Sequence, residues 1–257
     1  MGTQIAEYVQ KNLKGEAVLF AVCDADPARA EGLREKMTPR PAVTSMTDLI
    51  KISDLIVEAA SAGISGEIAE EAERLGKDVL IMSTGGLLKR PLTPRVHISS
   101  GAICGLDGLS SAGVGKIKSV TLTTRKPPQG LKGAPYLKEK NIDVEKIKKE
   151  TLVFSGNAED AIRHFPQNVN VAVTLSIRGI GPKDTMVRIF TSPEYVKNVH
   201  EVEVEGEFGR LFTRTENVPS RENPKTSQLA IFSAIAELKK MLNSEGHRVT
   251  RSPGRDA

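Results

Sequence analysis

Short apolar runs of strand length alternate with helix-like stretches over the first hundred residues, and this alternation limits the folds open to the chain. The runs lie at 17–23, 54–59, 78–82 and 96–99, with stretches of helical apolar spacing before and between them. Strand–helix repetition with short loops indicates a parallel sheet covered by helices. A continuous apolar run such as 17–23 is typical of a strand buried on both faces. The sequence therefore predicts an α/β fold whose first half is a Rossmann-like, doubly wound parallel sheet.

Small, hydroxyl-bearing or acidic residues follow these predicted strands. Asp24 follows the first run, Ala60 and Ser61 the second, and residues 83–86 and 100–102 the third and fourth. In open parallel sheets ligands bind at the carboxyl ends of the strands. Side chains this small at successive strand ends would let a flat cofactor lie across them, so we expect the cofactor site at this edge.

A run of small residues at 99–112, SSGAICGLDGLSSA, divides the chain, because strand–helix alternation precedes it and long β-type runs follow it. Glycine is costly in a surface helix but permits close approach of other backbone or of a flat ligand. We interpret the run as a hinge between a nucleotide-binding half and a catalytic half. The alternative is a packing loop without ligand contact. Asp107 is expected to be a buried acid that fixes the hinge.

The second half is expected to be an α+β catalytic domain with a mixed or antiparallel sheet. Strand-like runs lie at 117–125, 151–155, 185–191, 200–205 and 209–215. The stretch 169–177 fits either a helix or a strand, and the strongly apolar stretch 226–242 predicts a helix that packs back on the first half.

These patterns predict the domain boundaries. A dinucleotide-binding domain is expected over 1–107, completed by a C-terminal helical segment over 219–243. A catalytic and dimerisation domain is expected over 108–218, and a disordered tail over 244–257.

Composition and charge exclude several classes of protein. The 257 residues carry a formal net charge of +4, part of it in Arg248, Arg251 and Arg255 near the end of the chain. This is too little charge for a nucleic-acid-binding surface, and no aromatic residues accompany it. No apolar run approaches the ~20 residues of a membrane-spanning helix. The sequence therefore predicts neither a nucleic-acid partner nor a membrane segment.

The cysteines and histidines predict no metal site. Cys23 and Cys104 lie in apolar surroundings, and the four histidines are scattered. Neither residue type has the spacing of metal ligands. We expect both thiols to be reduced and buried, as in a cytoplasmic protein.

The start of the sequence matches only part of a dinucleotide-binding fingerprint. That fingerprint, G-x-G-x-x-G, joins a strand to a helix, and its third glycine permits close helix–strand packing. Gly2 fits the third glycine and helical spacing follows it at once, so we expect this sequence to lack the first strand and the start of the glycine-rich loop. Asp24 lies where an acid can hydrogen-bond the adenosine ribose, which favours NAD over NADP without excluding either.

Four segments together resemble the archaeal and bacterial L-aspartate dehydrogenases. They are SSGAICGLDGLSSA, FPQNVNVAVTLS, NVHEVEVEGEFG and ENVPSRENPKTSQLA, and the likeness extends from about residue 17 to about residue 242. The resemblance implies NAD- or NADP-dependent oxidation of L-aspartate to iminosuccinate, which can feed NAD biosynthesis or hydrolyse to oxaloacetate and ammonia, and the reverse amination. It also implies a homodimer whose dinucleotide domain is completed by a C-terminal helix.

The resemblance assigns roles to individual residues. His200 in NVHEVEV matches the family's catalytic histidine, and Asn170 in PQNVN matches a cofactor-contacting asparagine. Ala102 in SGAICG matches a position whose backbone meets the nicotinamide, and Gly2 matches the last fingerprint glycine. The loop STGGLLKR departs from the pattern usual in the family.

The reaction itself requires proton transfer. The substrate ammonium must lose a proton so that the nitrogen lone pair can expel the hydride, and a water must later attack the imine. A histidine suits both tasks because its reference pKa of about 6.5 lies near working pH. We therefore predict that His200 is the general acid/base; the alternative is a histidine that caps a sheet edge. His164, beside Phe165, is expected to be structural.

Aspartate presents two carboxylates, which require cationic or N–H donors. Lys225 in ENPKTS is the first candidate, because a helix start at Thr226 would add N–H groups. The alternative is an ordinary helix cap beside a solvated lysine. Arg125 and Lys126 are weaker candidates.

Two other functions remain open at this stage. The chain could be another two-domain reductase of similar plan, such as a homoserine dehydrogenase or a relative of dihydrodipicolinate reductase, which substrate profiling would distinguish. It could also be a truncated, non-enzymatic form, which titration with reduced cofactor would distinguish.

Overall fold

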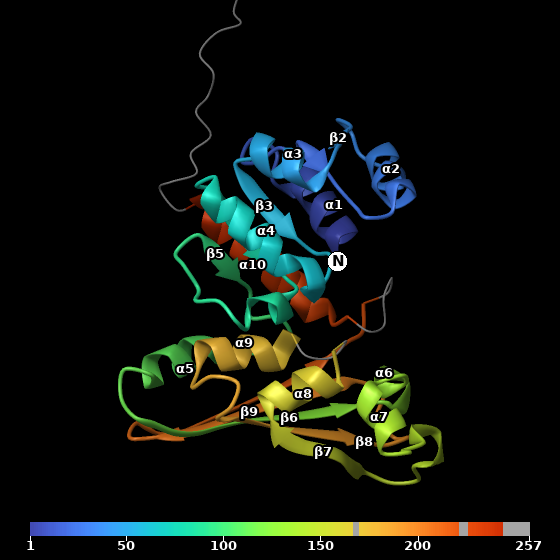
Figure 1. Ribbon diagram of the computed structural model, residues 1–257, viewed down its shortest axis with the longest axis vertical. Helices are drawn as coiled ribbons and strands as arrows, with labels where there is room; N and C mark the ends of the chain where they lie inside the picture. Colours follow the sequence, from blue (N-terminus) through green and yellow to red (C-terminus); the bar gives the residue numbers. More distant parts are fainter. Residues whose placement is uncertain (167–169, 221–225, 244–257) are drawn as a thin grey trace, which may run out of the picture.

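The computed structural model describes residues 1–166, 170–220 and 226–243. It has two layered halves stacked along the long axis of the molecule, as Figure 1 shows. In the described chain, no helix is both long and apolar enough to cross a membrane.

The first half alternates helices with short parallel strands. In chain order its elements are α1 (Gly2–Asn12), β1 (Ala21–Val22), α2 (Pro27–Glu35), β2 (Ala42–Val43), α3 (Met46–Ile52), β3 (Leu55–Glu58), α4 (Ala62–Arg74), β4 (Asp78–Ile81), η1 (Thr84–Leu87) and β5 (Val96–Ile98). Asp26 caps α2 by accepting a hydrogen bond from the Ala28 N–H, and Pro27 is the first residue of this helix. The predicted parallel α/β half is confirmed.

The parallel sheet is divided into two pieces. β1 pairs with β2, and β3, β4 and β5 form a separate sheet in that order. In a doubly wound sheet a further strand separates strands in the positions of β1 and β3, and no described segment pairs with both. The prediction that 17–23 is a strand buried on both faces is therefore wrong. Only Ala21–Val22 is strand, and Val18 and Phe20 are 74% and 58% exposed. An apolar run is buried on both faces only where other segments cover both of its faces, and one face of this run is uncovered.

Helices cover both faces of the three-stranded sheet. On one face, α1 and α10 (Gln228–Asn243) pack against β4, with Ile5, Leu80 and Ile231 in one apolar cluster. On the other face, α3 and α4 pack against the same sheet, with Ile50 and Ile81 in a second cluster. The apolar stretch 226–242 thus lies on the first half, although it follows the whole second half in sequence. It is helical from Gln228 onward and not from Thr226 as expected, because Ser227 forms an isolated bridge with Pro219.

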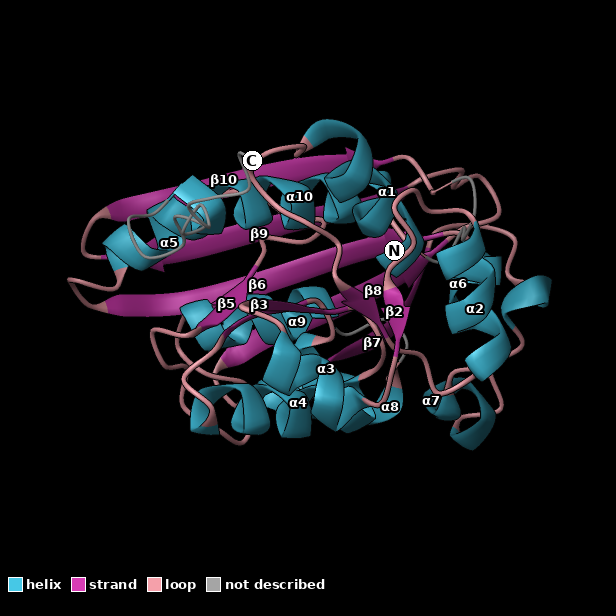
Figure 2. Cartoon of the chain, turned by 90° about the horizontal axis from the view of Figure 1, so that it is seen from above, coloured by secondary structure: helices cyan, strands magenta, loops and turns pink. Residues whose placement is uncertain are grey.

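The second half is a mixed five-stranded sheet with helices on one face, as seen in Figures 1 and 2. In chain order its elements are α5 (Leu106–Ala112), β6 (Ile117–Lys126), α6 (Pro128–Leu131), α7 (Pro135–Glu139), η2 (Val144–Lys146), β7 (Thr151–Asn157), α8 (Ala158–His164), α9 (Asn170–Arg178), β8 (Thr185–Thr191), β9 (Asn198–Gly206) and β10 (Gly209–Asn217). The strand order is β10-β9-β6-β8-β7, in which only β6 and β8 are parallel. The predicted mixed sheet is confirmed.

Helix α9 occupies the space between the halves. Its residues Ala172, Val173 and Leu175 are buried in the core of the second half, and Ile177 packs against the cores of both halves. The stretch 169–177, ambiguous in sequence, is therefore helical from Asn170 onward.

Three expectations about single residues are wrong. Cys23 and Cys104 are free but exposed, because both lie in loops after strands. Asp107 is also exposed, because it lies in the first turn of α5, where an acid is favourable without being buried. The expected tail, 244–257, lies outside the described residues.

Candidate active site

The carboxyl ends of β3, β4 and β5 face the second half. Thr84, which follows β4, donates from Oγ1 to the Asn170 carbonyl at 3.1 Å and so joins this edge to the first residue of α9. Ala102, which follows β5, is buried, and its carbonyl accepts Thr215 Oγ1 at 2.8 Å and Asn217 Nδ2 at 3.1 Å. The small-residue run at 99–112 is thus bonded to β10 at the junction of the halves.

The helix-covered face of the five-stranded sheet changes from apolar to polar along its length. Across β10, β9, β6 and β8, one row of register partners is Leu211, Val204, Val120 and Thr185, and the next is Thr213, Val202, Leu122 and Val187. The third row is Thr215, His200, Thr124 and Ile189. The last row lies two residues further along each strand. It holds Asn217 of β10 and Asn198 of β9, followed by Lys126 of β6 and Thr191 of β8. The polar rows lie at the end of the sheet that meets Ala102.

His200 lies in β9 within the third row and is 5% exposed. Its Nδ1 lies 3.0 Å from Thr124 Oγ1 on the neighbouring strand. In the described chain this is the ring's one hydrogen bond, so Nε2 is the nitrogen left to exchange a proton with a ligand. Burial, and then the positive charge of Lys126, lower the pKa of His200 to about 3. The ring is therefore neutral at physiological pH.

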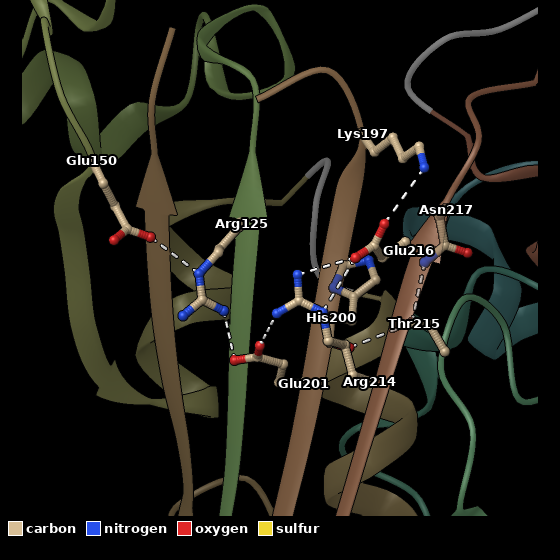
Figure 3. Close-up of polar contacts among 9 residues, drawn as sticks. All are labelled: Arg125, Glu150, Lys197, His200, Glu201, Arg214, Thr215, Glu216 and Asn217. Carbon is tan, nitrogen blue, oxygen red and sulfur yellow. Dashed lines mark hydrogen bonds and ion pairs between the residues drawn. The ribbon is translucent and has the colours of Figure 1, made fainter. Parts of the chain in front are cut away.

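Lys126 ends β6 and is equally enclosed. The side chain is 7% exposed, and burial lowers the pKa of its ammonium group to about 8. Arg125, its neighbour, points to the opposite face, where it donates to Glu150 at 3.1 Å and to Glu201 at 2.5 Å (Figure 3). Successive side chains of a strand point to opposite faces of the sheet, so these two neighbouring basic residues lie on opposite faces.

The buried imidazole makes stability depend on pH. The folded protein holds His200 with a pKa near 3, whereas an unfolded chain protonates it near the reference value of about 6.5. The unfolded state then binds more protons between these values, so stability is greatest above pH 6.5 and falls as the pH is lowered. We expect His200 to contribute about 3 kcal/mol to the loss between pH 7 and pH 4. Urea unfolding of wild type and His200→Asn at several pH values between 7 and 4 would measure this contribution. An equal loss of unfolding free energy in the two proteins would contradict the lowered pKa of His200.

The structure brings some predicted site residues together and separates others. Thr215 bridges Ala102 and His200, since its Oγ1 lies 2.8 Å from the Ala102 carbonyl and 3.5 Å from the His200 carbonyl. Asn170, exposed at the start of α9, is joined to this edge through Thr84.

The remaining predicted residues lie on the first half or outside the described chain. Gly2 begins α1, and a Cβ there would lie 3.6 Å from the Ala59 side chain, at the end of β3. Asp24 is exposed after β1 and accepts a hydrogen bond from the Asp26 N–H at 2.9 Å. Lys225 lies outside the described residues.

Sequence reasoning missed Glu58. This side chain ends β3, is 2% exposed, and its carboxylate accepts the N–H groups of Ala60 at 2.7 Å, Met82 at 3.1 Å and Ser83 at 2.8 Å. It therefore ties the ends of β3 and β4 together. The signal was a charged residue inside an apolar run, DLIVEA, which is rare without a buried partner.

Comparisons with known proteins agree with this arrangement of two halves. Residues 107–241 match the model of the aspartate dehydrogenase C-terminal domain, and residues 1–97 match that of the homoserine dehydrogenase NAD binding domain. An L-aspartate dehydrogenase of Methanosarcina mazei is 46% identical over 240 residues, which cover 89% of each chain. The chain belongs to the L-aspartate dehydrogenase family.

Other members of the L-aspartate dehydrogenase family are similarly close. L-aspartate dehydrogenase 3 of Bordetella bronchiseptica is 38% identical over 94% of this chain and 91% of its own. The crystal structure of the Thermotoga maritima aspartate dehydrogenase superposes with a TM-score of 0.63 at 25% identity, covering 88% of this chain and 97% of that one. The resemblance found in the sequence is confirmed, and the match at 1–97 indicates a pyridine nucleotide cofactor.

Proposed function

We propose that this chain oxidises L-aspartate with NAD or NADP to iminosuccinate, which hydrolyses to oxaloacetate and ammonia, and that it catalyses the reverse amination. The observation that carries the proposal is the position of His200: a buried, neutral imidazole at the polar end of the sheet, beside the strand that holds the Ala102 carbonyl. Membership of the family supports the same reaction.

The residues present fit a dinucleotide at the edge formed by β3, β4 and β5. The amino end of α1, eleven residues long, offers unpaired N–H groups beside the end of β3, where a pyrophosphate would bind. Asp24 is exposed where a ribose hydroxyl would lie, and the exposed amide of Asn170 is suited to a carboxamide. The cofactor, when bound, accepts the hydride from Cα of the substrate.

His200 performs the proton transfers in this proposal. Nε2 takes a proton from the substrate ammonium, which frees the nitrogen lone pair to expel the hydride toward the nicotinamide. Thr124, bonded to Nδ1, fixes the orientation of the ring. In the second stage the ring releases this proton to solvent, and the neutral ring then takes a proton from the water that attacks the imine carbon. The ring returns that proton to the amine nitrogen, the C–N bond breaks, and ammonia leaves. Overall, aspartate, water and oxidised cofactor give oxaloacetate, ammonium, reduced cofactor and a proton.

Two finer points extend the proposal. We infer a preference for NAD, because the exposed carboxylate of Asp24 would repel a 2′-phosphate. We also infer a homodimer, supported by the face of the five-stranded sheet that no described helix covers, where Phe212 is 52% and Leu152 47% exposed. Light scattering would give the mass in solution.

Substrate profiling tests the proposed reaction. With NAD or NADP in excess, we expect reduction of the cofactor with L-aspartate and at most a few per cent of that rate with L-homoserine or D-aspartate. Fluorescence titration with NADH and NADPH, which needs no turnover, would show saturable binding. Turnover of L-homoserine instead would favour the homoserine dehydrogenase alternative, and the absence of cofactor binding would contradict an enzymatic role for this chain.

A further inference from the structure

We propose that Asn217 is a positioning residue: its buried side chain joins the two crossings of the chain between the halves and so sets the position of the cofactor edge relative to His200. The inference rests on the proposed function, because the geometry that it fixes serves hydride transfer in that reaction.

The described chain passes between the halves at two places (Figure 1). The first crossing runs from the end of β5 to the start of α5 and contains Ala102. The second follows Asn217, the last residue of β10, and ends at Gln228, the first residue of α10. The relative position of the halves therefore depends on what holds these crossings, in addition to the contacts of α9.

Asn217 contacts both crossings through its side-chain amide. Its Nδ2 donates to the Ala102 carbonyl at 3.1 Å, and its Oδ1 accepts the Ser227 hydroxyl at 2.6 Å. All three residues are at most 6% exposed. A carbonyl can only accept a hydrogen bond, so the amide nitrogen must face Ala102 and the amide oxygen faces Ser227. One side chain at the end of the second half's sheet therefore binds both connections to the first half.

The same amide is connected to the strand of His200. Asn217 Nδ2 also donates to Thr215 Oγ1 at 3.2 Å, and Thr215 is the register partner of His200 (Figure 3). Both N–H groups and the oxygen of the amide are thus bonded. A fully bonded, buried polar network favours a single arrangement. This network holds the Ala102 backbone, at the carboxyl edge of the parallel sheet, against the strand that carries His200.

Backbone bonds tie the second crossing to the first half. The Gln228 N–H, at the start of α10, donates to the Val218 carbonyl at 2.9 Å, and the Ser220 N–H donates to the Thr226 carbonyl at 2.7 Å. Gln4 Nε2, in the first turn of α1, lies 3.4 Å from Ser220 Oγ. The second crossing therefore follows α1 and α10, and the Asn217 side chain holds it to the second half.

Hydride transfer is the step that needs both halves in register. The proposed cofactor edge belongs to the first half and His200 to the second, and a misplacement of about 1 Å can cost about 100-fold in rate. Weakening the Asn217 bonds should therefore lower kcat, whereas NADH should still bind, because most of its proposed contacts lie on the first half.

Asn217→Asp tests this with an isosteric change, because a carboxylate keeps the acceptor for Ser227 but loses the donor to Ala102. Asn157→Asp is the matched control, since Asn157 Oδ1 accepts the Asp160 N–H at 2.8 Å and a carboxylate can do the same. The rate would be expressed per NADH-binding site, so that unfolded protein does not count.

For Asn217→Asp we expect kcat per site with L-aspartate to fall about 100-fold, with the Kd for NADH within about threefold of wild type. Asn157→Asp should match wild type in both quantities. Ser227→Ala should lower kcat less, and the double variant with Asn217→Asp should lose no more than Asn217→Asp alone, because both residues act in one network. A merely structural role would reduce the number of NADH-binding sites and leave kcat per site unchanged.

A distance measurement between the halves needs no turnover and separates this proposal from the proposed function. Nitroxide labels would be placed at Glu70→Cys in α4 and Lys118→Cys in β6, two exposed positions, one in each half. Cys23 and Cys104, which are exposed and would also take the label, would be replaced by serine. Pulsed electron–electron double resonance would give the distribution of distances between the labels.

We expect a broader distribution in Asn217→Asp than in wild type or Asn157→Asp. If the distribution broadens in this way but wild type does not oxidise L-aspartate, the role of Asn217 in joining the halves stands and the proposed reaction falls. An unchanged distribution in folded Asn217→Asp, or in Ser227→Ala if the first variant does not fold, would overturn the assignment of Asn217.

Discussion

Replacing His200 by alanine is expected to lower kcat for L-aspartate oxidation by about 10²- to 10⁴-fold, the range typical of a lost general acid/base. The imidazole is buried and neutral, and Thr124 holds its Nδ1, so the ring is oriented before substrate binds. Alanine removes the proton acceptor without placing a polar group in the core. The affinity for reduced cofactor should change little, because His200 lies on the sheet of the second half. Stopped-flow or steady-state rates with matched fluorescence titrations would measure both quantities.

His164→Ala is the matched control for this prediction. His164 ends α8, and its ring packs edge-on against Tyr136 with a centroid separation of 5.1 Å, away from the polar rows. Its loss should lower stability and leave kcat within about threefold of wild type, since a ring contact contributes about 1 kcal/mol. Equal losses of kcat in the two variants would contradict a specific role for His200.

Replacing Glu58 by leucine is expected to lower the free energy of unfolding by about 3 kcal/mol, because buried N–H donors lose their acceptor. The N–H groups of Ala60 and Ser83 would be left without the carboxylate, whereas the Met82 N–H keeps a second acceptor, the Glu58 carbonyl at 3.1 Å. These donors lie where β3 and β4 end, so the change would also disturb the edge proposed to bind the cofactor. A weaker affinity for NADH should accompany the loss of stability.

Urea unfolding and NADH titration of Glu58→Leu would measure these two effects. Glu70→Ala, an exposed glutamate in the adjacent helix α4, is the control and should stay within about 0.5 kcal/mol of wild type. A Glu58→Leu protein as stable as wild type, with unchanged cofactor affinity, would show that water or rearranged backbone replaces the carboxylate.

Much of the fold could be predicted from the sequence because local patterns report on local burial. The apolar runs at β3, β4 and β5 predict strands and are confirmed, and these strands are largely buried because helices cover both faces of that sheet. The run at 17–23 has the same composition but lies partly exposed beside β2. The spacing of apolar residues predicts whether a segment is a helix or a strand, whereas its exposure depends on which other segments cover it.

The candidate site was predicted less completely, because its polar residues come together only through the register of the sheet. His200 and Thr124 are 76 positions apart in sequence and 3.0 Å apart in space. Of these two residues the resemblance identified only His200, and nothing local in TTRKPP distinguishes Arg125, which points away from the helices, from Lys126, which points toward them. That distinction requires knowing which face of β6 the helices cover.

Transfer of deuterium from L-aspartate labelled at Cα tests the central claim most directly. The purified protein would be incubated with the labelled substrate and NAD or NADP, and the reduced cofactor analysed by mass spectrometry. With wild type we predict one deuterium in each reduced nicotinamide. With His200→Ala we predict that almost no reduced cofactor forms. Reduced cofactor without deuterium, or labelled cofactor formed equally by both proteins, would contradict hydride transfer from aspartate at this site.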